Sequence, residues 1–293
     1  MAWLHGIFFL DQKRGWVAGS KGTLLQTLDG GNTWKSRGSS TEDVVRDIFF
    51  TDEQNGWLVV EVNAYQLKTK EEPRAYIMKT VDGGEHWDRI EIKGFDVDAI
   101  LVRAVFNRSG RGWTFGEGGS IYTTHDAGDS WVKLQSPTRR LLLGGIFVDD
   151  DRGWIVGAGA TIIQTSDGGE TWYQSELPQV EKSVRFNAAS FIDNRKGWAV
   201  GSGGSVYLTV NGGRTWQRQE SGVAVDLFDV KFLDALEGWA VGSAGTILHT
   251  TDGGEHWTSE RSNTPHPLER VCFTDKNHGW AVGFGGTVVS YLR

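Results

Sequence analysis

Arginine is the residue whose placement in this chain most favours binding chemistry. Its guanidinium group keeps its charge and carries five donors in a planar fork, which suits carboxylates and protein interfaces. Six arginines fall near the starts of segments expected to surround a central channel: Arg46, Arg103, Arg139, Arg140, Arg185 and Arg270. Acidic residues lie among them: Asp43, Asp47, Asp98, Asp226 and Asp229. The pattern indicates either a polar binding surface anchored by arginines or a mixed, solvated rim.

A second candidate for binding is a stretch that interrupts an otherwise regular chain. Residues 61–76 read EVNAYQLKTKEEPRAY and set Lys68, Lys70 and Arg74 against three glutamates. Loops on a rigid scaffold commonly carry function, so these cations are candidates for contact with a partner. A neutral surface insertion explains the segment equally well, and both interpretations stay open.

Residue types disfavour other kinds of site. The lone Cys272 excludes an intrachain disulfide and a cysteine-based metal cluster, and the seven histidines show no metal-ligand spacing. Glycine clusters such as GSGG at 201–204 precede strand-like segments rather than helices, so they indicate turns and not phosphate loops. We therefore predict no metal site and no cofactor.

Charge and hydropathy exclude further classes of partner. A net charge of −7 and a pI near 5.5 argue against a nucleic-acid-binding surface. No apolar run approaches the roughly 18 residues that a membrane-spanning helix needs. The first ten residues are apolar, but they have no basic start and Asp11 follows at once, so they do not predict a signal peptide.

The elements that must position these side chains follow from a repeat. The dipeptide Gly-Trp occurs seven times, at intervals of 41, 56, 41, 44, 41 and 41 residues, and a Phe stands seven residues before each Trp. A near-constant period of this size is typical of stacked supersecondary units. Each unit divides into short β-branched and aromatic segments separated by Gly, Asp and Asn turns. This pattern favours four strands per unit.

A second motif closes six of the units. It reads TLDGGNTW at 27–34 and TVDGGEHW at 80–87, and it is similar to the Asp-box, or BNR, repeat. Its Asp or Asn side chain can accept hydrogen bonds from backbone N–H groups just downstream, and its glycines supply angles that other residues avoid. A turn repeated around a ring belongs to the scaffold. We therefore assign a structural role to Asp29, Asp82, Asp126, Asp167, Asn211 and Asp252.

Seven units of four strands predict an all-β fold, a single seven-bladed β-propeller domain over residues 1–293. The expected blades cover about residues 1–41, 42–97, 98–138, 139–182, 183–223, 224–264 and 265–293. The seventh unit has no box, and Arg293 stands where its Asp would be. Only two residues precede the first innermost strand, too few to replace the missing one. We expect blade seven to lack its outer strand.

A catalytic alternative has to be weighed, because Asp-box propellers include sialidases and other glycosidases. The tyrosines fall mostly in the repeated third strand or in the insert, where packing roles are expected. An enzyme is expected to break its own repeat where its chemistry sits, and these units break it little. We therefore predict no catalytic residues. The alternative is a sialidase-like glycoside hydrolase or a carbohydrate-binding propeller.

The Gly-Trp strand with its preceding Phe-x-Asp, as in GWAVGSGGSVYLT at 197–209, resembles the photosystem II stability/assembly factor family. The resemblance covers the whole chain. It implies a non-catalytic propeller in the thylakoid lumen, periplasm or extracellular space that binds nascent reaction-centre subunits, with an arginine-rich patch contributing. The partner implied is a protein of a membrane complex. A relative that binds a different membrane or secreted complex is the open alternative.

Overall fold

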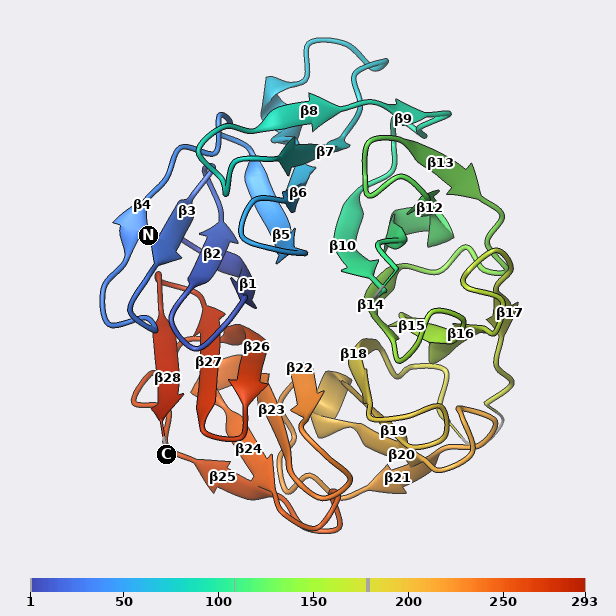
Figure 1. The fold of residues 1–293 in the computed structure, drawn as a ribbon. Coiled ribbons are helices and arrows are strands. Elements are labelled where there is room, and N and C mark those ends of the chain that lie inside the picture. Colours follow the sequence, from blue (N-terminus) through green and yellow to red (C-terminus); the bar gives the residue numbers. More distant parts are fainter. Residues whose placement is uncertain (1, 108, 178–179, 293) are drawn as a thin grey trace.

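The computed structural model describes residues 2–107, 109–177 and 180–292. These residues form seven small sheets arranged as blades around a ring (Figure 1), and their strands are antiparallel apart from one added strand in blade three. The predicted all-β, seven-bladed propeller is confirmed. Each blade is a meander whose first strand lies innermost, because the first strands of successive blades contact one another around the whole ring.

The strands are short and recur in the same order in each blade. The innermost strands are β1 (Leu4–Phe9), β5 (Val44–Phe50), β10 (Leu101–Phe106), β14 (Leu142–Phe147), β18 (Phe186–Phe191), β22 (Leu227–Phe232) and β26 (Leu268–Asp275). The second strands are β2 (Gly15–Gly19), β6 (Gly56–Glu61), β11 (Gly112–Gly116), β15 (Gly153–Gly157), β19 (Gly197–Gly201), β23 (Gly238–Gly242) and β27 (His278–Gly283).

The fourth strand of each complete blade is short and mostly exposed. The third strands are β3 (Leu24–Thr27), β7 (Ala75–Thr80), β12 (Ile121–Thr124), β16 (Thr161–Thr165), β20 (Val206–Thr209), β24 (Ile247–Thr250) and β28 (Val288–Leu292). The fourth strands are β4 (Lys35–Ser36), β8 (Asp88–Ile90), β13 (Trp131–Leu134), β17 (Tyr173–Gln174), β21 (Gln217–Gln219) and β25 (Thr258–Glu260). Within the described residues, blade seven has three strands, in agreement with the prediction.

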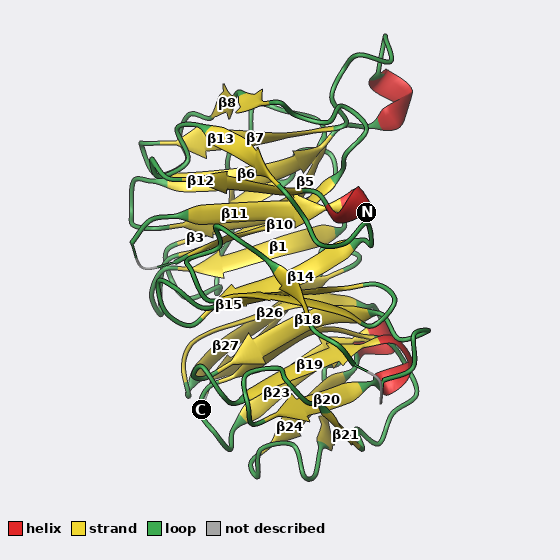
Figure 2. Ribbon diagram, turned by 90° about the vertical axis from the view of Figure 1, so that its right-hand side faces the viewer, coloured by secondary structure: helices red, strands yellow, loops and turns green. Residues whose placement is uncertain are grey.

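One strand departs from the simple repeat. The link between blades two and three contains β9 (Ile92–Lys93), which pairs in parallel with β13 and gives blade three a fifth strand. Four 3-10 helices complete the secondary structure of the described residues: η1 (Ala64–Gln66), η2 (Glu117–Gly119), η3 (Ser202–Gly204) and η4 (Ser243–Gly245). They lie on one face of the ring (Figure 2), in loops that join second to third strands. We call this side, which also carries the links between blades, the mouth face.

The ring is held by a Trp–Phe contact at every seam between blades, which is stacked at five seams and tilted at the other two. The Trp of each Gly-Trp pair lies against the repeat Phe of the next blade. Trp198 stacks on Phe232 with ring centroids 3.4 Å apart. Trp280 of blade seven stacks on Phe9 of blade one at 3.5 Å and so closes the ring. Such pairs add to the burial of large aromatic surfaces.

The Asp-box turns form on the face opposite the mouth, and each one is internally hydrogen-bonded. In the third blade, Asp126 Oδ1 accepts from the Thr124 hydroxyl at 2.7 Å and from the Ser130 backbone N–H at 2.9 Å. In the fifth blade Asn211 makes the corresponding bonds with its amide. The box side chains therefore make these hydrogen bonds within their own turns.

Candidate binding face around the channel mouth

Each innermost strand carries a β-bulge close to its start, on the mouth face. In every one of the seven first-to-second strand pairs, the register shifts across a single unpaired residue. The seven bulge residues are His5, Arg46, Val102, Leu143, Asn187, Phe228 and Glu269. A bulge re-aims the side chain of its extra residue. All seven side chains line one cavity of about 310 Å³, which we call the channel cup.

The channel cup is polar on one side and apolar on the other. Blades seven, one and two contribute Glu269, His5 and Arg46, and Arg46 Nε donates to Glu61 at 2.5 Å. Blades three and four contribute Val102 and Leu143, with Ile100 and Leu141 beside them. Burial, together with the nearby Arg46 and Arg270, lowers the pKa of His5 to about 3, so its imidazole is neutral at ordinary pH.

In blades two, three, six and seven the residue that follows the bulge is charged, and these four side chains form a buried network. Arg103 Nη2 of blade three lies 3.1 Å from Asp229 Oδ2 of blade six, so this ion pair spans the channel. The same carboxylate accepts from the Val271 backbone N–H, and Asp47 accepts from the Ala104 backbone N–H. Burial raises the pKa of Asp47, although Arg103 opposes that shift.

Arg270 belongs to the same network but lacks a close partner. Burial lowers the pKa of its guanidinium, and the positive charge of Arg103 adds to that effect. Two of the predicted binding arginines, Arg103 and Arg270, therefore lie inside the channel rather than on an open surface.

Arg185 forms a clasp between two blades. Its Nη2 lies 3.0 Å from Asp226 Oδ2, and its Nε donates to Asn187 Oδ1 at 3.0 Å. Asn187 in turn donates to the Leu227 carbonyl of the next blade. These contacts tie blade five to blade six and leave the guanidinium half-exposed.

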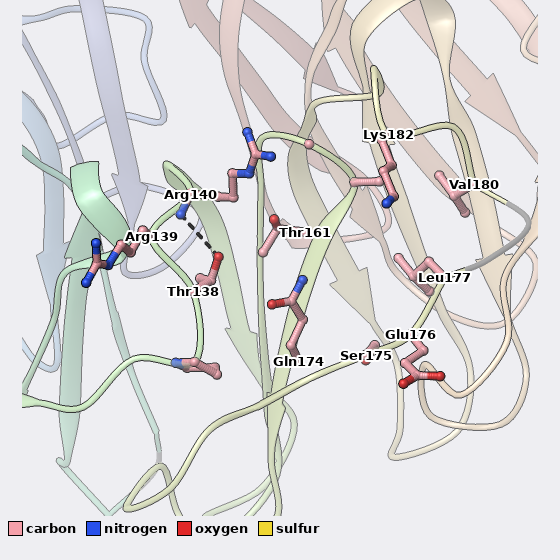
Figure 3. Close-up of a pocket in the computed structure, with 13 residues that line it drawn as sticks. Thr138, Arg139, Arg140, Thr161, Gln174, Ser175, Glu176, Leu177, Val180 and Lys182 are labelled. Carbon is pink, nitrogen blue, oxygen red and sulfur yellow. Dashed lines mark hydrogen bonds between the residues drawn. The ribbon is translucent and has the colours of Figure 1, made fainter.

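Arg139 and Arg140 form a separate and more accessible site. They follow the outer strand of blade three, both side chains are exposed, and neither forms an ion pair with any residue in the described ranges. Together with Lys182 they line a cavity of about 970 Å³, which we call the blade-four pocket. Figure 3 shows the two guanidinium groups directed apart, with Lys182 across the cavity. Glu176 is its acidic lining residue.

The cations of the insert differ in exposure. Lys68 and Lys70 are exposed near its tip, whereas Arg74 is half-buried at its base with Nη1 3.8 Å from Glu117. The base is fixed by the Tyr76 hydroxyl, which donates to Asp43 at 2.9 Å. Tyr65 at the tip is 99% exposed.

The structure thus divides the predicted arginines instead of gathering them into one patch. Arg46, Arg103, Arg185 and Arg270 serve the channel and its seams, while Arg139 and Arg140 face open space. Sequence reasoning did not find Lys182 or the apolar half of the channel cup. The available signal was the position four residues before each repeat Phe, which changes chemistry from blade to blade while the residue before it is always apolar.

Comparison with known proteins places the chain in a family. The family model described as "Photosynthesis system II assembly factor YCF48" matches residues 38–141, 131–223 and 218–292, which together take in most of the chain. The chain belongs to this family. The photosystem II stability/assembly factor HCF136 of Arabidopsis thaliana is 30% identical over 128 residues, which cover 41% of this chain and 28% of that protein.

Solved structures confirm the fold. A structure described as YCF48 bound to D1 peptide superposes with a TM-score of 0.79 at 21% identity, covering 100% of this chain and 92% of that one. A xyloglucanase from Xanthomonas campestris superposes with a TM-score of 0.78 at 12% identity, covering 99% of this chain and 52% of the enzyme. Such identities show a shared fold alone. In the described part of the chain, no helix has the length and apolar character needed to cross a membrane.

Proposed function

We propose that this chain is a non-catalytic assembly scaffold whose mouth face binds an acidic segment of a membrane-complex subunit. The observation that carries the proposal is the blade-four pocket, where Arg139, Arg140 and Lys182 present three cations with no ion pair among the described residues. Arginine side chains that retain their donors are suited to anchor a carboxylate-bearing partner.

The size and shape of the pocket favour a peptide segment. At about 970 Å³ it lies near the upper end of the roughly 300–1,000 Å³ typical of ligand pockets. Thr138, Thr161 and Gln174 add neutral hydrogen-bonding groups, while Leu177 and Val180 add an apolar wall. An acidic segment with a few apolar side chains matches this lining.

Family membership also supports binding of a membrane-complex subunit. The matching family is described as one of photosystem II assembly factors, and the description of one neighbouring structure records a bound D1 peptide. We extend that partner class, a photosystem or related membrane subunit, to this chain. A family of assembly factors also argues against the glycosidase alternative, which has the shared propeller fold as its support.

The experiment is a fluorescence anisotropy titration of a labelled D1 peptide against the full chain. The double variant Arg139→Glu/Arg140→Glu should weaken binding at least tenfold, because two attractive charges become repulsive. The matched control is Arg195→Glu/Arg214→Glu, since these two arginines line a cavity of about 640 Å³ on the opposite face. The control should change affinity less than twofold.

Two outcomes would overturn the proposal. One is equal affinity of the wild type and the Arg139→Glu/Arg140→Glu variant for the peptide. The other is a larger loss in the opposite-face control, which would move the binding site to the Asp-box side of the ring. Circular dichroism of both variants checks that they remain folded.

A further inference from the structure

The channel cup holds an arginine that has no ion-pair partner within 4.0 Å, although the more distant charges of Asp229, Asp47 and Glu269 act on it. Arg270 Nε is buried and makes no hydrogen bond with a described residue, and Nη1 donates to the Glu269 carbonyl oxygen at 2.9 Å. Among the described residues, no carboxylate oxygen lies within 4.0 Å of its guanidinium, whereas Arg46 and Arg103 both have such a partner. A buried and unpaired charge is costly, so this group favours a ligand that supplies an anion.

The neighbouring residue offers the opposite charge in the same cavity. Glu269 accepts a hydrogen bond from the Trp3 indole N–H at 3.1 Å, and it forms no ion pair with a described cation. Glu269 and Arg270 both line the channel cup. One residue pair therefore presents an unpaired carboxylate and an unpaired guanidinium to one space.

The overall charge of the cup argues against a simple ion. Its lining holds Arg46 and Arg270 against Glu61, Glu117 and Glu269, and His5 is neutral. Glu61 and Glu117 are already paired with Arg46 and Arg74. A lone anion would leave Glu269 unpaired, and a lone cation would leave Arg270 unpaired. A molecule that carries both charges satisfies both groups and leaves the charge of the lining unchanged.

The apolar residues of the cup, which lie on blades three, four and six, form the wall that specifies the rest of the ligand. Val102, Leu143 and Phe228 are half-buried bulge residues, and Leu141 lies with them. Covering this apolar wall with an apolar side chain removes it from water and stabilises the complex. The volume of about 310 Å³ is at the low end of the range for small-molecule sites.

We propose that the channel cup binds a small zwitterion with an apolar body, such as a free apolar α-amino acid. Its carboxylate lies on Arg270, its ammonium group on Glu269, and its side chain against Val102, Leu143 and Phe228. This site is separate from the blade-four pocket and goes beyond the assembly function proposed above.

The first test is calorimetric titration of the full chain with L-leucine and two analogues. One analogue, 4-methylpentanoate, lacks the ammonium group, and the other, 3-methylbutylamine, lacks the carboxylate. We expect saturable binding of one leucine per chain, with each analogue at least tenfold weaker. Absence of leucine binding, or an analogue that binds as well as leucine, overturns the proposal.

Variants then assign the two charges. Glu269→Gln should weaken leucine at least tenfold without weakening 4-methylpentanoate, because that ligand has no ammonium group and no longer faces the Glu269 charge. Arg270→Met should abolish binding of both. Since Arg270 also belongs to the buried network, Leu143→Ser provides a second variant, expected to weaken leucine at least fivefold at a half-exposed position.

The control separates this site from the proposed partner site. Arg139→Glu/Arg140→Glu should leave leucine affinity unchanged even where it abolishes peptide binding. Loss of leucine binding in that variant, or leucine affinity that is indifferent to Glu269→Gln, would contradict the assignment of the ligand to the channel cup.

Discussion

The Asp-box turns and the bulged strand starts are both repeated devices, but they repeat different things. The six boxes repeat a side chain, and each uses it to hold its own turn, as Asp126 does with Thr124 and Ser130. The seven bulges repeat a backbone irregularity and change the side chain every time, from Arg46 to Leu143. The fold therefore repeats the side chain in the box turns and varies it at the bulges, which is where we propose that a small ligand binds.

The largest effect is expected at Arg103, the residue that follows the bulge on β10. Arg103→Met should lower the free energy of unfolding by about 3–5 kcal/mol, because it leaves the buried Asp229 carboxylate without its ionic partner. Guanidinium chloride denaturation measures this loss. It would show that the residue after the bulge on β10 is under structural constraint, unlike the bulge residue itself.

A double variant provides the control for that prediction. Arg103→Met/Asp229→Asn removes the charge from both partners and keeps an acceptor for the Val271 backbone N–H. It should regain most of the lost stability, since neutralising both members of a buried pair is far less costly than removing one. If the double variant is less stable than the single one, the cross-channel pair is not the cause.

An intermediate effect is expected at an Asp box. Burial opposes the shift, but hydrogen bonds from Ser130 and Thr124 lower the pKa of Asp126 to about 2. Because the folded pKa lies below the ordinary value of about 3.8, its stabilisation is present above roughly pH 4. That stabilisation is lost as pH falls toward 2. Asp126→Ala should cost about 1 kcal/mol at pH 7, by analogy with side-chain caps.

Asn211 supplies the natural control for this pH dependence. It makes the same bonds to its turn without a titrating group. Asp126→Asn should therefore nearly match the wild type at pH 7 and lose less stability between pH 4 and pH 2. Parallel urea titrations at the two pH values check this, and identical acid slopes for the two proteins would count against the box as a source of acid sensitivity.

The smallest effect is expected at a bulge. Val102→Thr should change the free energy of unfolding by no more than about 0.5 kcal/mol, because the side chain is half-exposed and its new hydroxyl can reach water. Thermal denaturation beside Arg103→Met compares adjacent positions on β10. A loss above roughly 2 kcal/mol at Val102 would show that the bulge position is under structural constraint too, as the Asp-box position is.

Much of the fold could be predicted because it is encoded locally and repeatedly. Gly-Trp, the preceding Phe and the Asp box mark strand starts and turns within each unit, so seven blades and the three described strands of the last one follow from the sequence. The strand β9 could not be predicted in this way, because its two residues pair with the next blade and carry no turn signal.

The candidate site was less predictable because its contacts join distant residues. Arg103 and Asp229 are 126 residues apart and meet only after the ring closes. Their charges gave no sign of which arginines would be buried and which would stay free. The bulges could not be recognised from residue type, since side chains as different as those of His5 and Phe228 occupy the same bulge position in different blades. The prediction of an arginine surface around the channel mouth therefore remains a hypothesis that the variants above test.

The contact of Trp with Phe across each seam has a consequence for how the molecule loses its structure. A linear array of repeats frays from its terminal units, since each of those has a neighbour on one side only. Here Trp280 lies on Phe9, so the first and last blades are neighbours and no blade is terminal. Melting any one blade removes a partner from two others. The ring should consequently unfold as a single cooperative unit, and damage in any blade is shared by all seven.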